Sequence, residues 1–301
     1  MFQGLIYSTI SALAFASMAI LVKLGYAAGL DGAVMMQYRF TYAALILVPI
    51  LYFKDRSLLR ISWSNLWKCA FIGLVIYGLQ TTCFVRGLAY IPASTAALIL
   101  YIYPVAVALM SAVLLKAKIT RLTAVALALI MFGSCLVFYD AFLKKAETIG
   151  LLYAVGAMVF FSIYLVVMQV VLKKMRPLTA TLYIIIFAAI SFNLTGEPAA
   201  WLTQTPESLT IGMALGLFPG VIAVTFLFMS VEKIGSAYTS IFSSIEPVAT
   251  LAAAALFLDE HVVLLQIGGV AFIILGITLP NIHALIIRKR VVSQPEGSLQ
   301  G

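Results

Sequence analysis

Long apolar runs separated by short polar connections occupy almost the whole chain. Most runs are about 17–25 residues long, the length that a helix needs to cross a hydrocarbon core of about 30 Å. A membrane β-barrel would instead alternate apolar and polar residues, and these runs are continuously apolar. The pattern predicts ten membrane-spanning helices at residues 4–25, 33–53, 66–88, 92–115, 122–139, 149–172, 178–194, 209–231, 237–258 and 262–287.

The composition excludes most other classes of protein. Of the 301 residues, 63% are hydrophobic and 10% are charged, whereas a typical soluble protein is about 25% charged. This excludes a soluble globular fold, a disordered chain and a collagen-like chain. The first apolar run lacks a basic segment before it, which favours a spanning helix over a cleaved signal peptide. The three cysteines lie in apolar runs without a CxxC spacing, so we expect no disulfide, no metal site and no cofactor.

The basic residues predict the orientation of the chain. With the N-terminus inside, 14 of the 19 Lys and Arg residues fall on the inner side, four on the outer side and one, Arg39, within a span. Because Lys and Arg are retained in cytoplasmic loops, this bias predicts that both termini are cytoplasmic, in a plasma (bacterial inner) membrane. The net charge of +8 is therefore interpreted as an orientation signal and not as a nucleic-acid surface. Binding of anionic lipid is the alternative.

The two halves of the sequence resemble each other. Residues 4–7 recur at 150–153 and Phe15 falls on Phe161, at an offset of 146. Residues 103–106 fall on 246–249, at an offset of 143. The common order predicts two five-helix repeats, at residues 1–145 and 146–290, followed by a disordered cytoplasmic tail at 291–301.

The odd number of helices in each repeat has a consequence for transport. If the first repeat starts inside, it ends outside, so the second repeat must lie in the membrane with the opposite orientation. Inverted repeats of this kind underlie many secondary transporters, which place a binding site near the midplane and expose it to each side in turn. The predicted fold is therefore an all-α membrane protein with ten helices around a central cavity.

These features resemble the drug/metabolite transporter superfamily, in its EamA branch. The resemblance rests on the paired fourth helices at 94–104 and 240–247, on Tyr38-Arg39-Phe40 and on Leu258-Asp259-Glu260. It covers residues 4–287, with a departure at 115–118, where an acidic turn is usual in the family. The resemblance implies transport of small metabolites through a central cavity.

The ninth predicted helix carries a polar face. Thr239, Ser243, Glu246 and Thr250 follow each other at spacings of four, three and four, so they share one side of a helix. Glu246 is the only acid in any predicted span, and a carboxylate there is costly unless it is paired, protonated or hydrated. Two interpretations follow: Glu246 binds substrate or a proton, or it forms a structural ion pair with Arg39. For Arg39 itself, the alternative is a structural arginine that extends outward or caps backbone carbonyls.

Other polar and aromatic residues complete the predicted site. Tyr77, Gln80 and Thr81 share a face of the third helix, and we expect Tyr101 and Tyr164 to join them in one aromatic chamber. The alternative for each is ordinary packing between helices. Pro104 and Pro247 are expected to break the two fourth helices at equivalent points, next to the site.

The predicted function is secondary transport and not enzymatic catalysis. No Walker A sequence or zinc-protease motif is present. We expect export of small amphipathic metabolites, such as amino acids or related aromatic or cationic compounds, by a monomer or weak dimer, with protons as the candidate coupling ion. A substrate-selective channel and an intramembrane enzyme are the alternatives.

Overall fold

The computed structural model describes residues 2–143, 145–257 and 261–292, and every regular element in them is helical. The first half contains α1 (Phe2–Ala27), α2 (Gly32–Lys54), η1 (Arg56–Leu59), α3 (Trp63–Ala70), η2 (Phe71–Tyr77), α4 (Gly78–Tyr90), α5 (Ala93–Leu100), α6 (Tyr103–Leu115), α7 (Arg121–Val137) and η3 (Tyr139–Phe142). The second half contains α8 (Thr148–Val171), α9 (Pro177–Thr195), η4 (Pro198–Trp201), α10 (Pro206–Leu215), η5 (Gly216–Ile222), α11 (Ala223–Ser243), α12 (Glu246–Phe257) and α13 (Leu264–Val292). The motif Leu258-Asp259-Glu260 and residues 293–301 of the predicted tail lie outside the described residues.

Several of these helices are suited to a bilayer, as the apolar runs predict. Within the described residues, seven helical stretches are long and apolar enough to cross a membrane. One of them, Pro206–Ser243, has 38 residues, far more than the ~20 that one crossing needs. Gly235 interrupts this stretch with a φ of 80° and a ψ of 165°. Two further apolar stretches, Arg121–Val137 and Leu264–Leu279, are shorter. The described residues thus form an all-helical bundle whose long helices have the length and composition of membrane spans.

Irregular segments recur at matching positions in the two halves. The π-helical segment η2 begins at Phe71, and the second one, η5, begins 145 positions later at Gly216. α5 ends at Leu100 and α6 begins at Tyr103, directly before Pro104. The break between α11 and α12 comes 143 positions later, directly before Pro247. These offsets agree with those of the sequence matches.

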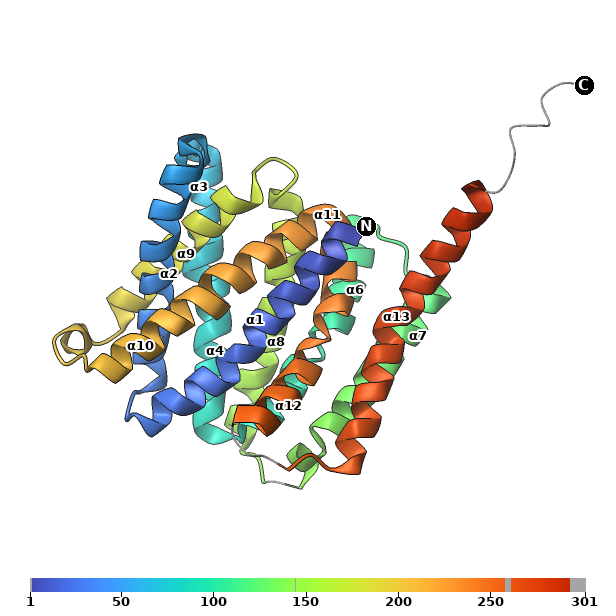
Figure 1. Ribbon diagram of the computed structural model, residues 1–301. Helices are drawn as coiled ribbons and strands as arrows, with labels where there is room; N and C mark the ends of the chain where they lie inside the picture. The colour runs from blue at the N-terminus through green and yellow to red at the C-terminus, as the bar shows by residue number, and fades with distance from the viewer. Residues whose placement is uncertain (1, 144, 258–260, 293–301) are drawn as a thin grey trace, which may run out of the picture.

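The helices of one half pack mainly against helices of the other. α1 packs against α11, α4 against α8, and α2 against α9. α7 and α13 pair with each other at one edge of the bundle (Figure 1). The largest buried cluster contains Tyr77, Tyr164 and Phe228 and lies between the two halves.

Glycines bring the π-helical segment η5 close to α2. A Cβ at Gly216 would lie 2.7 Å from the Cβ of Tyr42 and 2.9 Å from the backbone nitrogen of Ala43. Gly212 and Gly220 also face α2, at Tyr42 and Ala43 respectively. Gly212, Gly216 and Gly220 form two consecutive GxxxG spacings, which therefore serve packing between elements of this chain. It also fixes the position of Arg39, which lies on α2.

Gly216→Ala is expected to destabilise the fold, because the added methyl group meets backbone on α2. Overpacking of this kind typically costs about 1–3 kcal/mol. The measurement is thermal unfolding of the purified protein in detergent. Gly268→Ala is the matched control, since a Cβ there has no atom within 4 Å. An equal effect of the two substitutions would contradict the packing role of Gly216.

Candidate functional site

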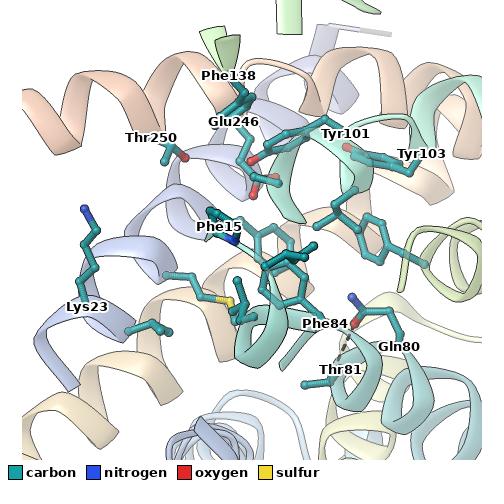
Figure 2. Close-up of a pocket in the computed structure, with 18 of the residues that line it drawn as sticks. Phe15, Lys23, Gln80, Thr81, Phe84, Tyr101, Tyr103, Phe138, Glu246 and Thr250 are labelled. Carbon is teal, nitrogen blue, oxygen red and sulfur yellow. Dashed lines mark hydrogen bonds between the residues drawn. The ribbon is translucent and has the colours of Figure 1, made fainter. Parts of the chain in front are cut away.

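A cavity of about 380 Å³ opens at one end of the bundle. Figure 2 shows its wall, to which α1, α2, α4, α8, α12 and the segment around Tyr101 contribute. Lys23 and Tyr26, near the end of α1, and Leu88, near the end of α4, line it at the same end of the molecule. The volume is at the lower end of the range for small-molecule sites, about 300–1,000 Å³. The cavity is thus suited to one small metabolite.

Of the described residues that line this cavity, Glu246 is the acidic one. It is the first residue of α12, so its position depends on the break at Ser244 and Ile245. Its carboxylate faces the hydroxyl group of Tyr101, which also interacts with Thr250 (Figure 2). A phenol beside a carboxyl group can donate a hydrogen bond to it. Tyr101 therefore positions the carboxyl group of Glu246 at the cavity wall.

Arg39 provides the opposite charge on another part of the wall. Its side chain is 3% exposed. Nη2 donates to the carbonyl oxygen of Pro219 at 2.9 Å and to the hydroxyl of Tyr77 at 3.2 Å. The guanidinium group also lies 5.0 Å from the ring centroid of Phe40. The π-helical segment η5 thus positions this arginine through the carbonyl of Pro219.

The two charges interact without forming an ion pair. Among the described residues, the ion pairs are Arg176 with Asp55 and Lys233 with Glu232, and none joins Arg39 to Glu246. Both residues nevertheless line the same cavity, and their charges interact electrostatically. The cavity therefore presents an acidic and a basic group separately to whatever occupies it.

The aromatic wall includes some of the tyrosines predicted from the sequence. Tyr77, Gln80, Thr81 and Tyr101 line the cavity. Tyr164 instead stacks behind Tyr77 with a ring centroid distance of 4.8 Å, and it is 1% exposed. The Tyr164 hydroxyl has no hydrogen-bond partner within the described part of the chain. Tyr164 thus supports the wall from behind.

Thr239 and Ser243 are not among the residues that line the cavity. The hydroxyl of Thr239 lies 3.0 Å from that of Ser230, and the hydroxyl of Ser243 lies 3.1 Å from that of Ser8 on α1. Both side chains are buried. The break between α11 and α12 separates these residues from Glu246 and Thr250, which do line the cavity. The polar face predicted for one continuous helix is thus divided between a helix contact and the cavity.

Sequence reasoning missed the contribution of α1. Phe15, Met18 and Lys23 line the cavity, although α1 is apolar on all sides and shows no distinct face. The internal repeat contained a usable signal. Phe15 corresponds to Phe161, and both residues line the cavity.

The comparisons with known proteins agree with this architecture. A helical membrane bundle with a small central cavity between two related halves defines a class of membrane transporter. A model of the EamA-like transporter family matches residues 2–139 and 148–282, and the chain belongs to that family. The members of this family are transporters, which move small molecules across membranes.

The fold also matches a solved structure. A chain described as "Crystal structure of protein" aligns with a TM-score of 0.80, over 94% of this chain and 98% of that one. The two sequences are 17% identical, so the likeness establishes the fold alone. No curated protein matches the sequence.

Proposed function

We propose that this protein is a secondary transporter that exports small amphipathic metabolites, such as amino acids or related aromatic or cationic compounds, by alternating access. The observation that carries this proposal is the cavity itself, in which Glu246 and Arg39 stand on an otherwise aromatic and apolar wall. Such a wall suits a solute with an apolar body and a charged end. Glu246 is proposed to bind an ammonium group or to carry a coupling proton.

Ten spans in two inverted repeats are part of the proposal. The break at Gly235 divides the stretch Pro206–Ser243 into two parts. The part before Gly235 supports an eighth span, and the part after it supports the start of a ninth span that continues into α12. The recurring π-helical segments support a repeat that relates residues 1–145 to 146–290. The cross-packing also has a twofold pattern, since α1 contacts α11 while its counterpart α8 contacts α4. Inverted repeats supply the two related conformations that alternating access needs.

A second cavity, at the other end of the bundle, supports alternation between two sides. It has a volume of about 230 Å³ and is lined by Ser111, Lys118, Gln169 and Gly235, among others. Val107 on α6 is completely buried between the two cavities. It lies one turn from Tyr103, which lines the first cavity, and one turn from Ser111, which lines the second. The two cavities share no lining residue. This separation favours a carrier over an open channel.

We propose, from the charge distribution, that the two ends of the bundle lie on the two sides of a bacterial inner membrane, with both termini in the cytoplasm. We expect a reporter fused after Arg290 to be cytoplasmic and a reporter inserted at Gln204 to be outside, because residues 195–208 contain no Lys or Arg. The measurement is the activity of a side-specific reporter at each position. In this orientation the larger cavity opens outward. Both reporters on one side would exclude ten spans and the inverted repeat.

Transport by purified protein in liposomes tests the function. Amino acids, nucleobases and quaternary amines are offered with and without a pH gradient, and protein-free liposomes are the control. A carrier is expected to show saturable uptake and counterflow for at least one solute. Uptake without saturation or counterflow would favour a channel. The absence of uptake of every solute would contradict the proposed substrate class.

A further inference from the structure

We propose that Arg39, held by Tyr77, is a carboxylate-binding residue of the central cavity, so that the protein selects zwitterionic substrates over simple cations. This inference rests on the proposed transport function and specifies the substrate of the same cavity. In the bound state, the substrate carboxylate lies against Arg39, its ammonium group lies against Glu246, and its apolar part lies on the aromatic wall.

The hydrogen bonds of Arg39 carry this inference. A guanidinium group has five N–H donors. Nη2 has two oxygen acceptors, but the nearest partners of Nη1 are the thioether sulfurs of Met18 at 3.4 Å and Met36 at 3.9 Å. Nε has no hydrogen-bond partner within the described part of the chain. Thioether sulfur is a weak acceptor, so most of the donor capacity of this buried cation is left for another group.

The position of these donors favours a ligand over a structural ion pair. Arg39 and Met18 both line the cavity, so an anion that displaces the thioether of Met18 reaches the guanidinium group from the cavity. A planar guanidinium binds a carboxylate through two parallel hydrogen bonds, which neutral acceptors do not reproduce. The carbonyl of Pro219 and the hydroxyl of Tyr77 hold the group at Nη2 and set its orientation.

The separate acid supplies the second half of the recognition. Glu246 lies on α12 with Tyr101 and Thr250 around it, and no ion pair joins it to Arg39 among the described residues. A zwitterion neutralises both buried charges at once. A cation without a carboxylate leaves Arg39 without its partner, and a site built around a polar group discriminates against an analogue that lacks that group.

Four probes that differ by single groups test this inference by titration calorimetry on the full-length protein. They are phenylalanine, its methyl ester, phenethylamine and 3-phenylpropionate, which share an aromatic body suited to the wall. We expect phenylalanine to bind the wild-type protein about 10–100-fold more tightly than each of the other three. Arg39→Gln is expected to remove the preference for phenylalanine over its methyl ester.

Two further variants keep the test specific. Arg86→Gln removes an equal charge from an exposed side chain of α4 and is expected to bind all probes as the wild type does. Tyr77→Phe retains the ring beside Tyr164 but removes the hydroxyl that holds Nη2, so the preference for the carboxylate is expected to fall several-fold even if Arg39→Gln does not fold. Equal wild-type affinities for phenylalanine and phenethylamine would overturn this inference and leave the transport function intact. Binding of none of the four probes would overturn both the inference and the proposed substrate class.

Discussion

Glu246→Gln is expected to abolish most of the transport while leaving the protein folded. Glutamine preserves the shape of the side chain but removes the charge at the cavity wall beside Tyr101. A hydrogen bond to a charged group contributes about 1.5–3 kcal/mol, so the loss of an ammonium or proton site should reduce flux about 10–150-fold. The measurements are counterflow in liposomes and thermal unfolding in detergent, each performed on wild type and variant.

The structure distinguishes this outcome from a role in folding. If Glu246 were the buried partner of Arg39, its removal would leave an unpaired charge and would cost about 3–5 kcal/mol of stability. The described residues contain no such pair, so the unfolding temperature is expected to be unchanged. A large loss of stability that is partly restored by Arg39→Gln would instead support the structural pair.

A control variant and a pH series complete the experiment. Glu232→Gln removes an acid whose side chain is 35% exposed and whose carboxylate lies 3.3 Å from the ammonium group of Lys233. It is expected to transport normally, because surface ion pairs contribute about 0–1 kcal/mol. An imposed pH gradient separates proton coupling from ammonium binding, since only proton coupling makes the wild-type rate depend on the gradient, and the flux of the variant is compared with wild type between pH 5 and pH 8. Unchanged flux of Glu246→Gln at every pH would eliminate both roles.

The features that could be predicted from the sequence depend on local periodicity. The apolar runs indicated the helices, and the solitary acid in a span indicated Glu246. The face shared by Tyr77, Gln80 and Thr81 also lies on the cavity, because the chain passes from η2 into α4 without a break and one helical stretch carries all three residues. A pattern on a continuous helical stretch is preserved when the chain folds.

The features that could not be predicted arise where a helix is interrupted or meets another element. The spacing of Thr239 and Ser243 with Glu246 assumed a continuous helix, and the break at Ser244 and Ile245 interrupts it. The hydroxyl of Ser243 lies beside Ser8 on α1, and that of Thr239 lies beside Ser230. One partner of Arg39 is the backbone carbonyl of Pro219, 180 positions away, and no side-chain pattern indicates it. Such contacts depend on the tertiary arrangement of α2 and η5 alone.

Opposite the open cavity, Gln169 is expected to hold the other end of the bundle closed. Its Oε1 accepts hydrogen bonds from the backbone N–H of Ser236 at 2.8 Å and from the Ser236 hydroxyl at 2.6 Å. The same hydroxyl lies 3.0 Å from that of Ser111 on α6. Gln169 thus links α8 to the segment that follows the turn at Gly235. An opening between these helices at the second cavity must first break these bonds.

Gln169→Leu is therefore expected to shift the protein toward the conformation that is open at the second cavity. Two neutral hydrogen bonds contribute about 1–3 kcal/mol in total, which corresponds to a change of about 5–150-fold in the ratio of the two states. The measurement is labelling of Gln80→Cys by an impermeant thiol reagent, in a background without the native cysteines. Labelling from the side of the larger cavity should fall, and labelling from the opposite side should rise.

Gln266→Leu provides the matched control for this change. Gln266 also makes two hydrogen bonds through its side chain, accepting from the N–H of Val263 at 3.1 Å and donating to the carbonyl of Val137 at 3.1 Å. It links α13 to α7 and lines neither cavity. The control is expected to keep the wild-type labelling on both sides. If Gln169→Leu also keeps the wild-type labelling, the bonds to Ser236 serve only to start the helix after Gly235, and the barrier between the cavities lies in the buried layer around Val107.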